Sequence, residues 1–359
     1  MKRLLEIQEY VGDVKRVADL DLPWEKLRGK VILITGGTGL VGSFLIDVLA
    51  VANLGCKVFL FGRSEEKAKA RFAEYWHDGW IEFVKWDAAA STLPTIDGSV
   101  DFVLHLARNT HPVAYATDPI GTITANVIAL KNLLELAAAK KCSRFLFASS
   151  NEIYGENRGD VELFDEKYCG YIDCNTLRAG YPESKRCGEA LCQAYIKQKG
   201  LDCVIARLTR TYGPTILPTD TKAISQFFNN ALRGEDIVLK SEGRQYYSYQ
   251  HVADSVLGLL IVLLKGEKGS AYNIADESGD ITLRELAKLI AEQADREVMF
   301  DVPDVVEAAG FSKATKARLD GLKLKGLGWS PNYDIRTGVV STMNVLKKMR
   351  CCVDVAGGE

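Results

Sequence analysis

Short apolar runs and longer amphipathic stretches alternate along the first two thirds of the chain. Six runs rich in Val, Ile, Leu and Phe predict β-strands, at residues 30–35, 57–61, 81–85, 101–106, 144–149 and 203–208. These runs are mostly apolar throughout, and helical patterns separate most of them. Since strands of this kind must be covered on both faces, the pattern predicts an α/β fold with a doubly wound parallel sheet.

The segment TGGTGLVG, residues 35–42, follows the first predicted strand and opens a helical pattern. Its glycines Gly36, Gly39 and Gly42 are spaced three apart. Such glycines permit a tight turn, let the backbone approach a pyrophosphate, and allow close helix–strand packing, while the helix N-terminus faces the phosphates. The context of strand, glycine turn and helix predicts a Rossmann-like unit that binds a dinucleotide.

The end of the second predicted strand bears on the choice between NAD and NADP. An acid about 20 residues beyond the glycines binds the ribose 2′-hydroxyl in many such units, but here the chain reads FGRSEEK. Arg63 stands where it could meet a 2′-phosphate, with Ser64 assisting, which favours NADP on electrostatic grounds. Asp87, after the third predicted strand, is a candidate for an adenine contact.

Two Tyr-x-x-x-Lys pairs occur, Tyr181–Lys185 and Tyr195–Lys199. Residues four apart share one face of a helix. A lysine there can lower the pKa of the tyrosine, whose phenolate can accept a hydroxyl proton as a hydride leaves. Tyr181 stands at a predicted helix start, shortly after the fifth strand, and this context selects the first pair as catalytic.

The segment LFASSNEIYG, residues 146–155, begins as a buried strand and ends in polar residues. Ser150, Asn151 and Glu152 place a hydroxyl, an amide and a carboxylate together where the strand ends. Ser150 and Glu152 are two residues apart, so in an extended segment both side chains can face the same side. We expect all three to be part of the catalytic site.

Composition excludes some classes of function. The 359 residues are 47% hydrophobic and 26% charged, and the formal net charge of −2 gives no support for nucleic-acid binding. No uninterrupted apolar run reaches the roughly 18 residues of a membrane span, and the first residues lack the apolar core of a secretory signal. The nine cysteines have spacings of neither a zinc site nor a disulfide framework. We therefore expect a cytoplasmic protein with reduced thiols, no metal and no membrane partner.

Four segments in order carry a family resemblance: the glycine turn, HLA at 105–107, SSNEIYG at 149–155 and YPESK at 181–185. Together they resemble the extended short-chain dehydrogenase/reductase family, over about residues 30–345. That family includes nucleotide-sugar epimerases, dehydratases and decarboxylases. The segments HLARNTHPVAYATDP, LRAGYPESKRCGEALCQAYIKQKG and IARLTRTYGP look closest to UDP-glucuronate decarboxylases.

The resemblance implies roles for individual residues. It implies a tightly held NAD or NADP, Tyr181 as the base, Lys185 on the ribose, and Ser150 between substrate and tyrosine. Glu152 would stand near C5 or C6 of the sugar. Asn151 replaces the acid that the 4,6-dehydratases use to protonate the departing hydroxyl, and an amide cannot supply that proton. Decarboxylation therefore ranks first, 4-epimerisation second and dehydration third.

The residues and the resemblance together give the expected contacts of cofactor and substrate. For the cofactor they are Gly36, Thr38, Gly39, Leu40, Val41, Gly42, Arg63, Ser64, Asp87, Leu106, Ala107 and Lys185. For the substrate they are Tyr115, Arg178, Arg210, Arg244 and Tyr247. Two departures from the family stand among them: Tyr247 replaces the arginine that grips the diphosphate, and Arg210 replaces an asparagine. We expect Arg210 or Arg244 to supply the missing positive charge.

The chain divides into four expected parts. Residues 1–29 form a helical extension, 30–207 the NAD(P)-binding domain with the catalytic residues, 208–350 mainly a smaller substrate lobe, and 351–359 a tail. Residues 271–275 are expected to return a strand to the sheet. The family implies a homodimer built on helices near 126–141 and 181–199. Reduction of a non-sugar carbonyl and non-catalytic binding of NAD(P) are compatible with the same motifs, and the nucleotide and sugar stay open.

Overall fold

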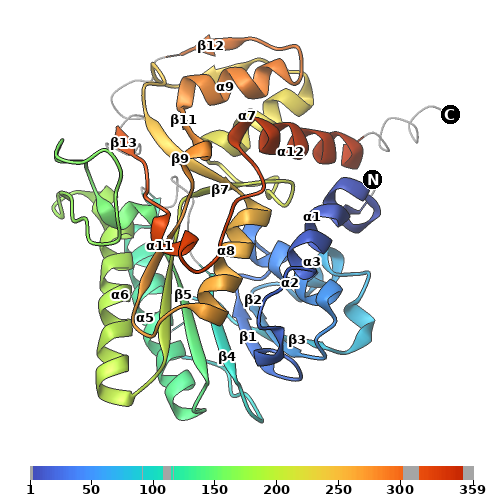
Figure 1. Ribbon diagram of the computed structural model, residues 1–359, viewed down its shortest axis with the longest axis vertical. Helices are drawn as coiled ribbons and strands as arrows, with labels where there is room; N and C mark the ends of the chain where they lie inside the picture. The colour runs from blue at the N-terminus through green and yellow to red at the C-terminus, as the bar shows by residue number, and fades with distance from the viewer. Residues whose placement is uncertain (1–2, 91, 108–114, 116, 302–314, 351–359) are drawn as a thin grey trace.

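The computed structural model describes residues 3–90, 92–107, 115, 117–301 and 315–350. Seven parallel strands form the large sheet in the lower half of Figure 1. Their order across the sheet is β10 (Ala271–Ile274), β6 (Cys203–Leu208), β5 (Arg144–Ser150), β4 (Phe102–His105), β1 (Val31–Thr35), β2 (Lys57–Gly62) and β3 (Ile81–Lys85). The strand order reverses direction between β1 and β4, as in a doubly wound sheet, so the predicted fold class is confirmed.

Helices cover both faces of this sheet because its strands are apolar on both sides. On β1, Leu33 belongs to the apolar cluster under one helical layer, whereas Ile32 and Ile34 belong to the cluster under the other. The first layer contains α5 (Pro119–Ala139) and α6 (Gly180–Lys199), side by side in Figure 1. The second contains α2 (Leu40–Ala52), α8 (Val252–Lys265) and α1 (Gln8–Ala18).

A smaller lobe stands above the carboxyl ends of the strands in Figure 1. Its sheets comprise β7 (Arg210–Tyr212), β9 (Tyr246–His251), β11 (Asp280–Thr282) and β13 (Lys316–Ala317), and the separate pair β8 (Ile237–Leu239) and β12 (Val298–Phe300). Its helices are α7 (Ala223–Arg233), α9 (Leu283–Glu292) and α12 (Ile335–Arg350). The other helices of the described residues are α3 (Glu65–Arg71), α11 (Leu322–Lys325) and the 3₁₀ turns η1 (Leu4–Glu6), η2 (Trp24–Lys26), η3 (Trp76–Asp78), η4 (Asn151–Tyr154), η5 (Leu177–Ala179) and η6 (Glu277–Gly279).

All six strands expected from the apolar runs are present, and their ends differ from the expected ones by no more than one residue. The run at 271–275 is β10, which pairs in parallel with β6 and so returns the chain to the large sheet. Sequence patterns therefore locate the sheet well, because each of its strands is apolar enough to stand out from its flanks.

Helix α5 is long and apolar enough to cross a membrane by length and composition alone. It packs against α6 and β4, and several of its side chains are buried there, as in a core helix of a folded domain. Ile120, Ile123 and Ile128 on the same helix are exposed.

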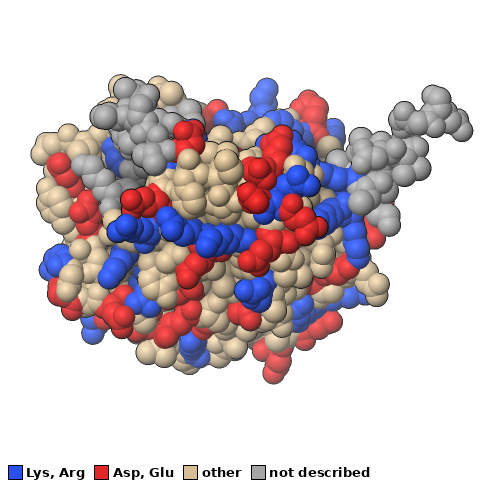
Figure 2. Space-filling model, turned by 90° about the horizontal axis from the view of Figure 1, so that it is seen from above, with Lys and Arg blue, Asp and Glu red and all other residues tan. Residues whose placement is uncertain are grey.

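In the view of Figure 2, basic and acidic side chains are interspersed, which agrees with the small formal net charge.

The N-terminal helix α1 is joined to the sheet domain by a buried polar cluster around Asp47 of α2. This carboxylate is fully buried and accepts hydrogen bonds from the hydroxyl of Tyr10 on α1, from Arg71 on α3, and from the hydroxyl of Tyr75 at 2.5 Å. Burial and the charge of Asp47 raise the pKa of Tyr75 well above its usual value, so this phenol stays a donor. One carboxylate thus joins α1, α2 and α3.

Asp47→Ala should lower the free energy of unfolding by about 3–5 kcal/mol, because it leaves the Arg71 guanidinium without its buried partner. Tyr10→Phe removes one donor and keeps the ring, so it should cost only about 1.5–3 kcal/mol. Urea denaturation of both variants measures the difference. Equal losses for the two would show that the carboxylate does not organise the cluster.

Candidate active site

The glycine turn between β1 and α2 leaves no room for a side chain at Gly36 or Gly42. Gly36 has φ +73°, and a Cβ atom there would stand 2.7 Å from the backbone nitrogen of Ala107. A Cβ at Gly42 would stand 2.3 Å from the carbonyl oxygen of Gly36. Gly39 caps α2, and no side chain closes that helix end with a hydrogen bond. The first-turn N–H groups, with Thr38, Leu40 and Val41 around them, therefore suit a pyrophosphate, and this part of the site fits a dinucleotide.

His105 at the end of β4 has a structural role beside this turn. Its Nδ1 lies 2.8 Å from Thr35 Oγ1, which also accepts a hydrogen bond from the backbone N–H of Ala107 at 3.1 Å. Burial and the nearby charge of Lys185 lower the pKa of His105 to about 3. The ring is therefore neutral, and it joins the ends of β1 and β4 next to Leu106 and Ala107.

The other expected cofactor residues follow β2 and β3 at the same edge of the sheet. Arg63 is exposed. Ser64 caps α3 by accepting a hydrogen bond from the backbone N–H of Lys67 at 3.2 Å. Asp87 is also exposed, and its Oδ1 accepts from the backbone N–H of Ala89 at 3.0 Å. Ser64 and Asp87 thus have local structural contacts, whereas Arg63 extends to the surface.

The polar end of β5 turns directly into η4. Ser150 is 5% exposed, pairs in register with Leu208 of β6, and caps η4 by accepting a hydrogen bond from the backbone N–H of Glu152 at 3.3 Å. Asn151 is 6% exposed, and its Oδ1 lies 3.5 Å from Ser150 Oγ. The expected hydroxyl, amide and carboxylate are therefore neighbours at the carboxyl edge of the sheet.

Helix α6 supplies the expected base and its lysine. Tyr181 and Lys185 are both almost fully buried, one turn apart. Lys185 Nζ donates to the carbonyl oxygen of Ala148 at 3.0 Å and lies 4.7 Å from the centre of the Phe147 ring. Both of these contacts belong to β5, so Lys185 is held against the strand that ends in Ser150.

Glu152 forms an ion pair with Arg178, which the sequence did not reveal. Arg178 Nη2 donates to Glu152 Oε2 at 2.6 Å. Burial alone would lower the pKa of Arg178, but the Glu152 carboxylate raises it, and the net shift is upward. The guanidinium carbon lies 4.8 Å from the centre of the Tyr115 ring, and that ring stacks on Tyr181 with 5.0 Å between the centroids. The structure thus brings the expected substrate residues Tyr115 and Arg178 into contact with Tyr181 and Glu152, two of the residues expected to be catalytic.

A second ion pair, also not predicted, connects helix α6 to the sheet. Arg207 on β6 donates to both carboxylate oxygens of Glu189 on α6, through Nε at 3.0 Å and Nη2 at 2.7 Å. Ser149 Oγ donates to the same carboxylate at 2.6 Å. The only signal in the sequence is an arginine in the apolar strand CVIARL.

The two arginines expected to replace the missing one differ in their surroundings. The guanidinium carbon of Arg210 lies 3.4 Å from the centre of the Tyr247 ring, and Arg210 Nη1 is buried with no hydrogen-bond partner among the described residues. Arg244 has an 83% exposed side chain and pairs with Glu242 at 2.6 Å. The structure therefore joins Arg210 and Tyr247 and leaves Arg244 at the surface.

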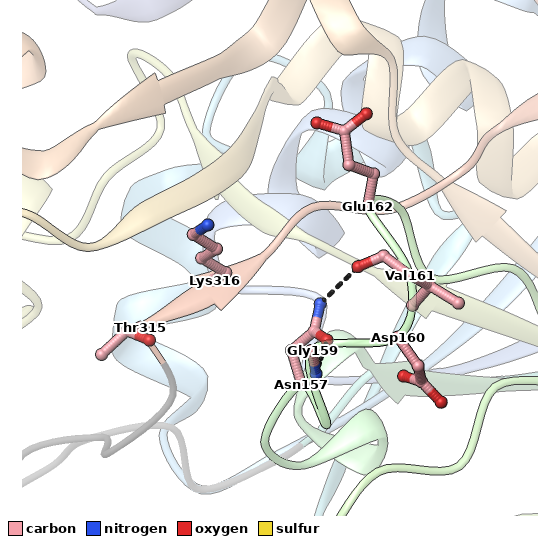
Figure 3. Close-up of a pocket in the computed structure, with 7 residues that line it drawn as sticks. All are labelled: Asn157, Gly159, Asp160, Val161, Glu162, Thr315 and Lys316. Carbon is pink, nitrogen blue, oxygen red and sulfur yellow. Dashed lines mark hydrogen bonds between the residues drawn. The ribbon is translucent and has the colours of Figure 1, made fainter.

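A cavity of about 420 Å³ lies apart from these residues, between the loop after η4 and β13 (Figure 3). Its lining residues are Asn157, Gly159, Asp160, Val161, Glu162, Thr315 and Lys316. None of the expected catalytic, cofactor or substrate residues lines it.

Among the described residues, no group of three or more His, Cys, Asp or Glu could hold a metal ion, and all seven cysteines of the described ranges are free.

Comparison with solved structures gives the same architecture. The dTDP-glucose 4,6-dehydratase DesIV from Streptomyces venezuelae aligns with a TM-score of 0.76 and 24% identity, over 89% of this chain and 98% of that one. The UDP-glucuronic acid 4-epimerase from Bacillus cereus aligns with a TM-score of 0.75 and 20% identity, over 89% and 99%. At these identities the likeness supports the fold.

Sequence comparison identifies relatives of higher identity and the family. UDP-glucuronic acid decarboxylase 4 from Arabidopsis thaliana is 31% identical over 339 residues, which cover 94% of this chain and 72% of that protein. UDP-glucuronic acid decarboxylase 1 from Xenopus tropicalis is 32% identical over 326 residues, covering 89% and 72%. The model of the NAD dependent epimerase/dehydratase family matches residues 32–275. These matches confirm the resemblance expected from the motifs, and the chain belongs to the NAD dependent epimerase/dehydratase family.

Proposed function

We propose that the protein is an NAD-dependent nucleotide-sugar decarboxylase that acts on a UDP-glucuronate-like substrate through a 4-keto intermediate. The observation that supports the proposal is that α6, which carries Tyr181 and Lys185, packs on β5 and η4, with Lys185 bonded to Ala148, two residues before Ser150. Its relatives named as UDP-glucuronic acid decarboxylases support the reaction. The family name and the NAD bound in related structures favour NAD over NADP.

Individual residues have separate roles in the proposed reaction. The turn with Gly36 and Gly42 holds the pyrophosphate. The bound nicotinamide supplies a hydride acceptor for C4 and returns the hydride at the end. Tyr181 takes the proton of the C4 hydroxyl, Ser150 orients that hydroxyl, and Lys185 stabilises the phenolate.

Loss of CO2 follows from the position of the new ketone. A carboxylate at C6 is β to a ketone at C4, so the C5–C6 bond can break with its electron pair moving toward the C4 oxygen. CO2 leaves, C5 takes up a proton, and Tyr181 returns a proton to the C4 oxygen once the ketone is reduced. No hydroxyl has to be protonated as it departs, so Asn151 is compatible with this reaction and unsuited to water elimination. A simple 4-epimerase, which needs only Ser150, Tyr181 and Lys185, is the second candidate.

The same proposal includes a cytoplasmic homodimer. Helices α5 and α6 pack side by side, and α5 exposes Ile120, Ile123 and Ile128. Two such pairs would cover these apolar side chains in a four-helix bundle.

Tyr181→Phe removes the proton acceptor and keeps the ring that stacks on Tyr115. Conversion of UDP-glucuronate should fall about 10²–10⁴-fold with the fold intact, as for other positioned acid–base groups. Tyr195→Phe is the matched control, because the Tyr195 hydroxyl bonds Glu135 at 2.6 Å within the α5–α6 pair. Its activity should be nearly unchanged. Comparable losses at both positions would mean that the wrong Tyr–Lys pair was chosen.

Glu152→Gln keeps the shape of the side chain and removes its charge. If Glu152 handles the C5 proton or orders the C6 group, oxidation at C4 should survive while product formation slows. Reduced nicotinamide should then accumulate, visible near 340 nm, when UDP-glucuronate is added. Normal turnover of this variant would make the carboxylate structural and favour 4-epimerisation.

Arg210→Ala should raise KM for UDP-glucuronate about tenfold or more, the size expected for loss of a charge-assisted hydrogen bond to the diphosphate. Stacking on Tyr247 occupies the face of the guanidinium and leaves its N–H edge for phosphate oxygens. The surface variant Arg244→Ala is the control and should leave KM unchanged. If neither variant affects KM, a diphosphate ligand is excluded for this arginine.

A further inference from the structure

Helix α1 lies where the chain passes between the sheet domain and the smaller lobe. The chain makes this passage between β6 and β7, between β9 and α8, and again at residues 330–334, which lead from Trp329 in the core of the sheet domain to α12. In Figure 1, α1 lies between α2 and α12, and it contacts both of these helices as well as α8. The N-terminal extension is therefore in contact with both parts of the molecule.

Three rings from the connecting segments meet in one cluster: Tyr212 of β7, His251 at the end of β9, and Tyr333 just before α12. The centre of the His251 ring lies 5.7 Å from that of Tyr212 and 4.3 Å from that of Tyr333. Burial and the nearby charge of Arg16 on α1 lower the pKa of His251 to about 3, so the ring between the two tyrosines is neutral. Because all three rings belong to connecting segments, a movement of one lobe against the other has to rearrange this cluster.

Helix α1 holds Tyr333 through Asp13, whose side chain is only 1% exposed. The Asp13 carboxylate accepts hydrogen bonds from the Tyr333 hydroxyl at 2.6 Å and from Arg16 Nη2 at 2.5 Å. The guanidinium carbon of Arg16 lies 5.3 Å from the centre of the Tyr333 ring. Tyr10, three residues before Asp13 and so on the same face of the helix, donates to Asp47 of α2. One face of α1 is thus bonded to the sheet domain and to the entrance of α12.

We propose that the hydrogen bond between Asp13 and Tyr333 fixes the smaller lobe over the sheet domain, and that both are positioning residues for the nucleotide sugar. This inference rests on the proposed function. In that function the C4 hydroxyl of the sugar lies at Ser150 and Tyr181 in the sheet domain, whereas the diphosphate lies at Arg210 in the smaller lobe. A ligand bound from both parts requires one particular separation between them.

The expected effect is confined to ligands that contact both parts. Without the hydrogen bond, other arrangements of the lobes become populated, and the apparent affinity falls in proportion to the fraction of molecules left in the competent one. NAD is held at the glycine turn of the sheet domain, so its affinity should not depend on α1. UDP lacks the sugar and does not reach Ser150, so its binding should depend on the lobe arrangement much less than that of UDP-glucuronate.

Tyr333→Phe removes the hydroxyl and keeps the ring beside His251. Binding is measured by calorimetry on NAD-loaded protein in a Tyr181→Phe background, which prevents turnover. The change at Tyr333 should weaken UDP-glucuronate about tenfold and UDP about twofold or less. Tyr75→Phe is the matched control, because the Tyr75 hydroxyl also donates to a buried carboxylate, at 2.5 Å, but entirely within the sheet domain. It should lower the stability to a similar extent and leave both affinities unchanged.

A double-mutant cycle tests whether the two residues act through their shared hydrogen bond. Asp13→Ala, Tyr333→Phe and the double variant all lack the same bond, so the double variant should weaken UDP-glucuronate little more than the stronger single change. Fully additive losses overturn the inference. So does equal weakening of UDP and UDP-glucuronate, which would indicate local damage to the smaller lobe, or an unchanged affinity for UDP-glucuronate in Tyr333→Phe.

Release of CO2 from UDP-glucuronate by the protein with Tyr181 intact tests the proposed function separately. If CO2 is released but the affinity for UDP-glucuronate does not depend on Tyr333, only the inference fails. If that affinity depends on Tyr333 and no CO2 appears, only the decarboxylase proposal fails. If UDP-glucuronate does not bind to the unmodified protein, both fail.

Discussion

The buried ion pair between Arg207 and Glu189 is the constraint on which the geometry of the site depends. Glu189 lies one turn beyond Lys185 on α6, and Arg207 pairs in register with Ser149 of β5. Because Ser149 and Arg207 bond the same carboxylate, β5, β6 and α6 are joined at one point. Charges buried this far are costly unless every donor is used, and Arg207 also donates to the hydroxyl of Tyr154 at 2.8 Å. The relative position of strand and helix is therefore fixed close to Ser150 and Lys185, the residues proposed to act in catalysis.

The glycine turn imposes a second constraint at the same edge. Close approach of Gly36 to Ala107 brings the loops after β1 and β4 together, and the neutral His105 ring joins those strands from within. Protonation of His105 would place a further positive charge near Lys185 in a buried space, and the pKa of about 3 shows how strongly burial and that lysine oppose it. The charge of Lys185 is thus kept beside the proposed base without competition from a charged His105.

The sheet could be predicted from the sequence because the information is local. Runs such as CVIARL are apolar on both faces, so their strands stand out, and the glycine spacing identifies the turn that follows β1. The contacts of the site could be predicted only in part. The pairs Glu152–Arg178 and Glu189–Arg207 join residues that are 26 and 18 positions apart on different elements. No periodicity marks such pairs, because one depends on how η5 meets η4 and the other on how α6 packs on β6.

Arg244 and Arg210 show that the sequence alone does not reveal which of two basic residues is buried in the fold. In the sequence, each is a basic residue near a family motif. Either could therefore supply the positive charge that the arginine expected at position 247 would have given. In the structure Arg244 extends into solvent beside Glu242, whereas Arg210 is partly buried over Tyr247. Burial and an aromatic support distinguish the two, and both properties arise from strand pairing that the sequence does not encode locally.

That strand pairing is compatible with the expectation that Arg210 supplies the positive charge which the family resemblance places at position 247. Strands β7 and β9 run parallel, with Arg210 opposite Tyr249, so side chains from residues 210 and 247 meet in one place. If Arg210 takes over the charge expected at position 247, that charge moves only between neighbouring strands. Tyr247 then supports the guanidinium through its ring face, a role that a small apolar residue could not fill. We therefore interpret the two departures as one coupled change, because the arginine at 210 depends on the aromatic ring at 247.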